Sequence, residues 1–237
     1  ALLEMILAKT REITGADAGS LYVVETARPE NNGGANGGNG KSERRLRFKL
    51  TQNDSRQFPF AEYTLPLGKD SLAGYAALHG EVIALDNAYA LPAGRPYRFN
   101  PRYDEAAGYR TQSSLTVPMK NARGEVIGVV QLLNCKRNRA ARLVTREDIA
   151  REVQPFPEHS VRLAESLASQ AAVAYENSRL YQDIEALFEG FVQAAVTAIE
   201  QRDTTTSGHS QRVSQMTVGL AEIVDRVDTG AYAGTRF

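Results

Sequence analysis

The sequence has no excess of charge of either sign, no long apolar run and only one cysteine, and each absence argues against a class of protein. Lys and Arg number 28, as do Asp and Glu, so no basic surplus is available to neutralise a nucleic-acid backbone. No apolar run approaches the roughly 20 residues that cross a bilayer, and we expect no membrane segment. Cys135 cannot form an internal disulfide, which favours the cytoplasm, and it predicts a buried thiol rather than a nucleophile.

Histidine is scarce as well. The chain holds only His79, His159 and His209, and no His-Asp dipeptide occurs. A hydrolytic di-metal centre needs several His and Asp ligands to hold two ions and activate water. We therefore expect no metal cofactor in this chain, and an independent hydrolase is the least favoured function.

Residues 29–42 are rich in Gly and Asn and have almost no apolar side chain to bury, which predicts a mobile loop. The segment ends in Gly40-Lys41-Ser42, as a phosphate-binding P-loop does. That motif requires glycine where Ala35 stands and a helix afterwards, whereas the next residues alternate like a strand. The P-loop interpretation is therefore disfavoured.

Apolar periodicity predicts most of the remaining elements. Leu2 to Ile13 have helical spacing that ends at Gly15, and two further stretches of strand-like alternation read as a hairpin around the mobile loop. Further along, the patterns predict a short helix, a single strand and a second hairpin with a buried central strand. The ranges are 20–25 and 45–50 for the first hairpin, 71–78 for the helix, 81–86 for the strand, and 115–119 and 126–133 for the second hairpin.

Two other segments stand out. Residues 87–112 are rich in aromatic and turn-forming residues, which predicts a long, sticky loop of the kind that serves a binding site. After a charged insertion at 136–157, apolar residues recur three and four apart from Leu163 to Ile199, with one slip of phase near Tyr181. A helix this long exceeds what one small domain covers, so we expect a homodimer through it, with a weak point at Gly190.

The order of these elements resembles a GAF domain, and several short motifs support the resemblance. The resemblance implies an α+β fold with an antiparallel sheet flanked by helices, occupying residues 1–157, followed by a long signalling and dimerisation helix at 158–202. The resemblance to a GAF domain covers roughly residues 1–180. The motifs are Leu72-Ala73-Gly74, Gly80-Glu81-Val82-Ile83, Arg98-Phe99-Asn100, Gly108-Tyr109-Arg110-Thr111, Ser114-Leu115-Thr116-Val117-Pro118 and Gly128-Val129-Val130-Gln131-Leu132-Leu133-Asn134.

The resemblance also implies a small-molecule pocket between the sheet and the 87–112 segment, with Phe99 on the lid. Phe48 would offer a stacking face, and Asp104 would offer polar contacts. The family's Asn-Lys-x-x-x-Phe-x-x-x-Asp-Glu signature is reduced here to Asn134-Cys135-Lys136. In the alternative interpretation the same residues pack a core and the pocket is small or empty. The residues implied to face the pocket are Ser20, Phe48, Leu72, Ala73, Asp104, Thr111 and Gln131.

Residues 198–213 resemble the start of an HD-GYP domain, a metal-dependent phosphodiesterase that hydrolyses cyclic di-GMP. The family usually has Pro where Thr204 stands. The resemblance implies that 203–237 form one further helix of a truncated all-α HD domain, and that His209 is a ligand of an Fe- or Mn-type di-metal centre in the full-length parent. Helical spacing places His209 in line with Val213 and Met216, facing an interior.

The leading hypothesis is a sensory GAF module that binds a small molecule of unknown identity and controls an HD-GYP phosphodiesterase in bacterial signal transduction. The alternative is a structural dimerisation module of the same phosphohydrolase that binds no ligand.

Overall fold

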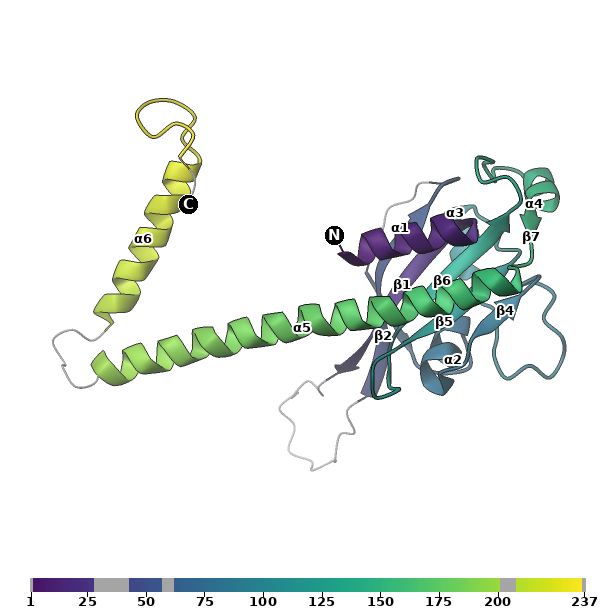
Figure 1. Ribbon diagram of the computed structural model, residues 1–237, viewed down its shortest axis with the longest axis horizontal. Coiled ribbons are helices and arrows are strands. Elements are labelled where there is room, and N and C mark those ends of the chain that lie inside the picture. The colour runs from purple at the N-terminus through teal and green to yellow at the C-terminus, as the bar shows by residue number, and fades with distance from the viewer. Residues whose placement is uncertain (1, 28–42, 57–61, 201–207, 236–237) are drawn as a thin grey trace. The chain divides into compact units, whose positions relative to one another are not determined.

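The computed structural model describes residues 2–27, 43–56, 62–200 and 208–235 (Figure 1). The loop predicted at 29–42 lies outside the described residues. The chain divides into two compact units, residues 1–177 and 178–237. The first unit is an antiparallel sheet flanked by helices, which confirms the predicted α+β class.

The first helix and hairpin form where the sequence pattern places them. Helix α1 (Leu2–Thr14) ends at Gly15, whose φ of +73° suits glycine. Strands β1 (Ala16–Ala27) and β2 (Glu43–Asn53) pair antiparallel. Leu46 and Phe48 are buried, as their alternation with charged residues predicts. The three-residue strand β3 (Thr64–Pro66), which pairs with β2, was not predicted.

The central strand of the sheet is β6 (Val126–Lys136), as its nearly continuous apolar run predicts. It lies between β1 and β5 (Ser114–Lys120), and β4 (Ile83–Leu85) forms the edge, in the order β3-β2-β1-β6-β5-β4. A Cβ atom added to Gly128 would lie 2.5 Å from the Tyr22 carbonyl oxygen. Glycine is therefore required where β6 passes β1.

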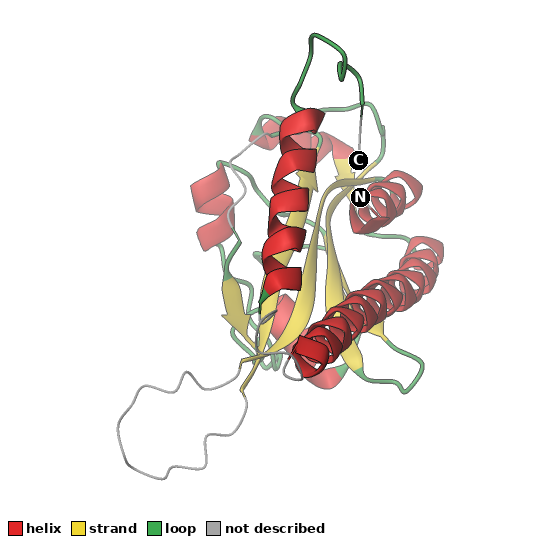
Figure 2. Ribbon diagram, turned by 90° about the vertical axis from the view of Figure 1, so that its left-hand side faces the viewer, coloured by secondary structure: helices red, strands yellow, loops and turns green. Residues whose placement is uncertain are grey.

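The two faces of the sheet carry separate hydrophobic clusters. On one face, α1 and the first part of α5 (Glu158–Glu200) cover Leu21 and Val23 of β1 (Figure 2). On the other face, α2 (Leu72–His79) covers Tyr22 and Val129. Helix α2 begins at Ser71, whose Oγ accepts a hydrogen bond from the Gly74 amide at 3.0 Å. Because side chains alternate along β1, this one strand contributes to both clusters.

The segment 87–112 is predicted to be a loop throughout. In the structure it contains helix α3 (Arg102–Ala107). Six residues are too few to show an apolar period, and the only buried side chain in the helix is Asp104. Polar and backbone interactions fix its ends instead. The Asn100 side chain accepts a hydrogen bond from the Arg102 amide at 3.1 Å, and Gly108 closes the helix with φ +58°.

The insertion at 136–157 is folded into the first unit. It carries α4 (Arg146–Glu152) and the short strand β7 (Val153–Gln154), which pairs with the end of β6. Thr145 and Asp148 form a capping box at the start of α4. Leu143, Ile149 and Val153 form a small apolar cluster beneath it.

Helix α5 begins in the first unit and ends in the second. Ala164, Ala168 and Ala171 are buried in the cluster on the sheet, whereas Leu163, where the predicted apolar pattern begins, is 43% exposed. The second unit contains the rest of α5 and α6 (His209–Asp225). In it, Phe188 and Phe191 are 67% and 70% exposed.

A buried ion pair joins the start of β1 to the end of β6. The Lys136 ammonium lies 3.1 Å from the Asp17 carboxylate, and both side chains are almost completely buried. The same ammonium donates to Asp54 at 3.0 Å. Cys135, beside this pair, is buried as predicted.

Replacing Lys136 with Met should lower the free energy of unfolding by about 3–5 kcal/mol, because the Asp17 charge would stay buried without its partner. The matched control is Lys9→Met, which removes an ion pair between the exposed side chains of Lys9 and Glu12 and should cost no more than about 1 kcal/mol. Urea unfolding of the three proteins measures both effects. Equal midpoints for the two variants would show that the buried pair does not stabilise the fold.

Candidate functional site

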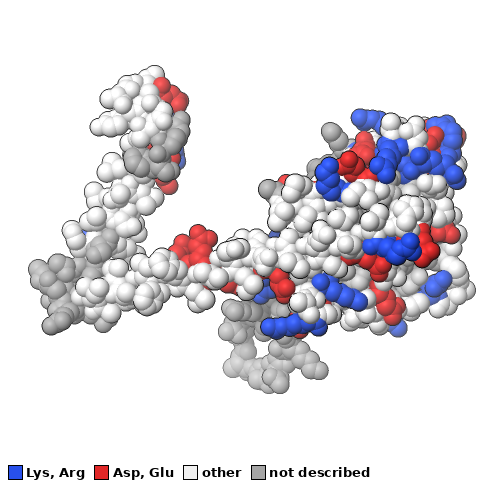
Figure 3. Space-filling model, viewed as in Figure 1, with Lys and Arg blue, Asp and Glu red and all other residues white. Residues whose placement is uncertain are grey.

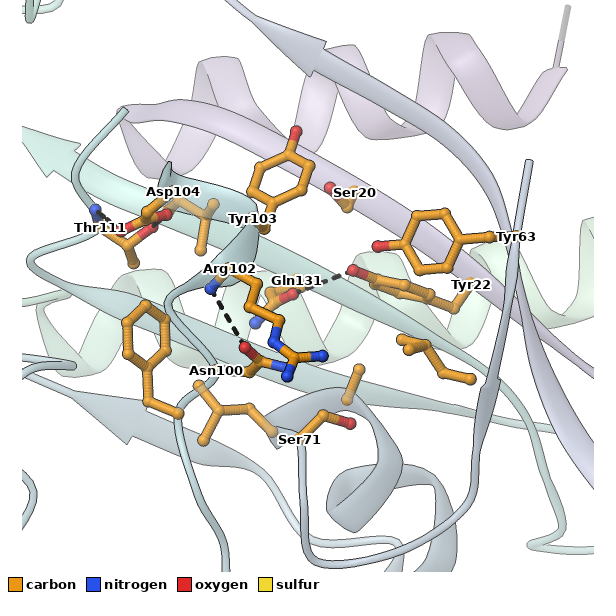
Figure 4. Close-up of a pocket in the computed structure, with 15 residues that line it drawn as sticks. Ser20, Tyr22, Tyr63, Ser71, Asn100, Arg102, Tyr103, Asp104, Thr111 and Gln131 are labelled. Atoms are coloured by element: carbon orange, nitrogen blue, oxygen red, sulfur yellow. Dashed lines mark hydrogen bonds between the residues drawn. The ribbon is translucent and has the colours of Figure 1, made fainter. Parts of the chain in front are cut away.

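A cavity of about 310 Å³ lies between the sheet and α3 (Figure 4). Its floor comes from β1 and β6, and its walls come from the start of α2, the segment around β3, and residues 99–104. The size is at the lower end for sites that hold small organic ligands. The lining residues are Ser20, Tyr22, Tyr63, Leu65, Ser71, Leu72, Ala73, Phe99, Asn100, Arg102, Tyr103, Asp104, Thr111, Gln131 and Leu133.

The structure places seven of the eight predicted pocket residues around this cavity. Phe48 is the exception. Its ring lies in the hydrophobic cluster, with its centroid 5.1 Å from that of Tyr22 and 4.9 Å from that of Tyr63. These two tyrosines line the cavity in its place, because on β2 the Phe48 side chain points into the core beneath them. Any role of the other seven in binding remains a prediction.

Polar side chains on the floor hydrogen-bond to one another. The Tyr22 hydroxyl donates to Gln131 Oε1 at 3.3 Å (Figure 4). Gln131 is the register partner of Ser20 on the neighbouring strand, so the two side chains stand side by side. Burial raises the pKa of Tyr22 well above its ordinary value, which keeps the phenol neutral and able to donate. The floor can therefore satisfy a polar edge of a ligand.

Aromatic rings surround the space above this floor. Tyr63 comes from the segment before β3 and Tyr103 from α3, and Figure 4 shows the Tyr22 ring next to that of Tyr63. Burial raises the pKa of Tyr103 to about 12, and that of Tyr63 is raised for the same reason. Neutral phenols offer flat apolar faces with polar tips, which suits a planar ligand.

The start of α2 contributes backbone amides. Leu72 and Ala73 line the cavity in the first helical turn, where backbone N–H groups have no partner within the helix. Arg102, at the start of α3, is the only Arg or Lys among the described lining residues and is exposed. A helix N-terminus and a guanidinium together favour an anionic group.

Hydrogen bonds of Asp104 link α3 to the chain that follows the helix. Its carboxylate accepts hydrogen bonds from the Thr111 amide at 2.6 Å, the Thr111 hydroxyl at 2.8 Å and the Tyr89 hydroxyl at 2.8 Å. Burial raises the pKa of Asp104, and the three hydrogen bonds oppose that shift without cancelling it. Both carboxylate oxygens already have partners in the protein, so Asp104 holds the cavity wall in place.

Sequence reasoning missed Tyr22, Tyr63, Arg102 and Tyr103. Tyr22 alternates with Leu21 on β1, so strand periodicity around Ser20 could have found it. Arg102 and Tyr103 line the cavity from α3, a helix that no local sequence pattern predicts. Tyr63 precedes β3 and has no local pattern that points to the site.

His209 begins α6 and is exposed, as are Val213 and Met216 on the same helix, so the predicted interior position is not observed. Within the described ranges, no three His, Cys, Asp or Glu side chains come together as a metal site. The described residues do not fit a di-metal centre by themselves. None of the helices in the described ranges combines the length and apolar composition needed to cross a membrane.

Comparison with known proteins gives matches to the first unit. The GAF domain model matches residues 1–175. The dual 3',5'-cyclic-AMP and -GMP phosphodiesterase 11A of Takifugu rubripes is 33% identical over 131 residues, which are 54% of this chain and 14% of that protein. The dual 3',5'-cyclic-AMP and -GMP phosphodiesterase 11 of Drosophila melanogaster is 29% identical over 136 residues, 56% of this chain and 8% of that protein.

The matched segments are thus less than a fifth of either phosphodiesterase. Among solved structures, residues 122 to 287 of a methyl-accepting chemotaxis protein match with a TM-score of 0.50 and 19% identity, covering 76% of this chain and 88% of that one. That likeness concerns the fold alone. Because the family model spans most of the sequence and the first unit has the expected sheet and cavity, the chain belongs to the GAF domain family.

Proposed function

We propose that this chain is a sensor that binds a planar, anionic small molecule in the cavity beneath α3 and controls an HD-GYP phosphodiesterase. The observation that carries the proposal is the cavity itself, with aromatic rings, one guanidinium and the N-terminus of α2 around one space. Cyclic nucleotides are the first ligands to test, since they combine a flat base with a single phosphate. The relatives named for cyclic AMP and cyclic GMP support this choice.

Each part of such a ligand has a partner in the cavity. The base would lie among Tyr22, Tyr63 and Tyr103, with its polar edge toward Gln131. The phosphate would lie toward Arg102 and the first turn of α2. The aromatic contacts fix the plane of the ligand and the charged contacts fix its direction, as expected of a selective pocket.

The proposed output is an HD-GYP domain that begins near residue 203. Its support is the sequence resemblance over 198–213, which includes His209 as a candidate metal ligand of the full-length parent. The first part of helix α5 covers the sheet of the sensor, and the same helix continues to Glu200. A change at the sheet would therefore reach the output through one continuous element.

The proposal includes a homodimer through α5. Tyr181, Ile184, Phe188 and Phe191 are exposed by 61–75% in the second unit, and the last three follow coiled-coil spacing. Exposed apolar side chains at this density mark an interaction surface. A second copy of the helix presents the same stripe and covers it.

A structural module that binds no ligand is the second candidate, and one observation favours it. The polar groups of the cavity partly satisfy one another, since Asp104 accepts three hydrogen bonds and Tyr22 donates to Gln131. A pocket satisfied in this way could remain empty. Ligand binding distinguishes the two candidates.

Calorimetric titration with cyclic GMP and cyclic AMP tests the sensor. We expect one of them to bind and to stabilise the protein by about 2.7 kcal/mol at a hundred times its dissociation constant. Arg102→Gln should weaken binding about tenfold or more, because a charged hydrogen bond contributes about 1.5–3 kcal/mol. The control is Arg98→Gln, another exposed arginine near α3 that does not line the cavity.

Absence of binding to either nucleotide would exclude cyclic nucleotides as the ligand and favour the structural module. An equal effect of both arginine variants would show that Arg102 has no specific contact with the phosphate.

The dimer is tested by light scattering at high micromolar concentration. The wild-type chain should be a dimer, and Phe188→Glu should shift it toward monomer by more than tenfold in dissociation constant, since burying each Phe contributes about 1.5–3 kcal/mol. Gln193→Glu is the matched control, because it adds the same charge at an exposed polar position of the same helix. A monomeric wild-type chain would contradict the dimer.

A further inference from the structure

Helix α3 separates the cavity from a second cleft on its other side. This outer cleft has a volume of about 300 Å³, and Tyr89, Arg110 and Arg146 are among its lining residues. Within α3, Arg102 and Tyr103 line the cavity and Glu105 lines the outer cleft. Asp104 is the residue of α3 that lines both. The helix is therefore a partition between two spaces.

The outer cleft is suited to an anion. Arg110 lies over the Tyr89 ring, with the guanidinium carbon 4.1 Å from the ring centroid. Arg146 begins α4 on the facing wall. Neither guanidinium forms an ion pair within the described part of the chain. The carboxylates of Glu105 and Asp104 also line the cleft, but both oxygens of Asp104 already accept hydrogen bonds from Tyr89 and Thr111.

The surroundings strengthen the positive potential. Exposed arginines follow one another through the insertion, and Lys and Arg gather at the end of the first unit where α4 and β7 lie (Figure 3). Like charges of this density attract small anions from solution. The arginines are Arg137, Arg139, Arg142 and Arg146, whereas Arg151 of the same segment pairs with Asp148 and Glu152.

We propose that the outer cleft is a second binding site, for a small molecule bearing a phosphate or carboxylate group held between Arg110 and Arg146. The Tyr89 ring lies against the Arg110 guanidinium, and this contact limits the positions that the guanidinium can adopt at the cleft. Two guanidiniums can grip such a group with paired hydrogen bonds.

Occupation of this site alters the wall of the cavity. The Tyr89 hydroxyl donates to Asp104 Oδ2, which also accepts from the Thr111 amide. The Tyr89 ring packs edge-on against Phe99, which lines the cavity, with centroids 5.0 Å apart. Burial raises the pKa of Asp104 and the Arg110 charge opposes that shift, so a bound anion that offsets the charge raises this pKa further. Tyr89 and Asp104 thus connect the outer cleft to the cavity.

The binding test is a titration of the full chain with inorganic phosphate, observed through the arginine Nε–Hε signals in nuclear magnetic resonance at constant ionic strength. The Arg110 and Arg146 signals should shift and saturate. Arg110→Gln and Arg146→Gln should each weaken phosphate at least tenfold. Arg142→Gln, an exposed arginine of the same segment outside the cleft, should leave the affinity unchanged.

Signal shifts that never saturate, or an equal loss of phosphate affinity in the Arg142 and Arg110 variants, would contradict a specific site. They would indicate a diffuse ionic effect instead.

The connection to the cavity is tested with Tyr89→Phe, which keeps the ring beneath Arg110 and removes the hydroxyl that donates to Asp104. Phosphate should shift the Thr111 amide signal in the wild-type chain and much less in the variant, while binding with similar affinity to both. An unchanged shift of the Thr111 amide signal in the variant would show that the Tyr89 hydroxyl does not connect the outer cleft to the cavity. Neither measurement requires a ligand in the cavity, so its failure is distinct from failure of the proposed sensor.

Discussion

The Asp17 carboxylate holds together the segments on which the site depends. It is completely buried and accepts hydrogen bonds from Ser55 at 2.7 Å and Tyr109 at 2.8 Å, besides its ion pair with Lys136. These partners come from three places: the chain after β2, the residue that follows α3 and Gly108, and the end of β6. A buried carboxylate is tolerated only when it is paired in this way. The position of α3 above the sheet therefore depends on a charge at the start of β1.

Asn134 extends the same network. Its side-chain amide donates to the Tyr109 hydroxyl at 2.9 Å and to the Arg110 carbonyl at 2.8 Å, and its oxygen accepts from the Gln112 amide at 2.7 Å. Asn134 has a positive φ of 56°, the only non-glycine residue with one in the described ranges. The chain that leaves α3 is thus held by side chains of β1 and β6, whose pairing is set by the sheet.

The sequence predicted the elements that bury apolar faces and missed those fixed by polar contacts. The hairpins and α2 have clear periods and caps, so local patterns suffice for them. Helix α3 has one buried residue, Asp104, whose hydrogen-bond partners Tyr89 and Thr111 lie outside the helix. Within the site, Ser20 and Gln131 line the cavity, whereas Tyr22 and Tyr63 line it where the resemblance implies Phe48. Which of several stacked rings faces a cavity is decided by packing between strands, and no local pattern contains that information.

The alternation of β1 has a mechanical consequence. Ser20 and Tyr22 belong to the floor of the cavity, while Leu21 and Val23 between them belong to the cluster covered by α1 and α5. The cavity and the cluster beneath α5 are therefore separated by the thickness of a single polypeptide strand. The side chains on both faces belong to one backbone and are closely packed. A shift of the side chains on one face therefore also moves those on the other. A single sheet thus forms both the floor of the cavity and the surface on which α1 and α5 pack.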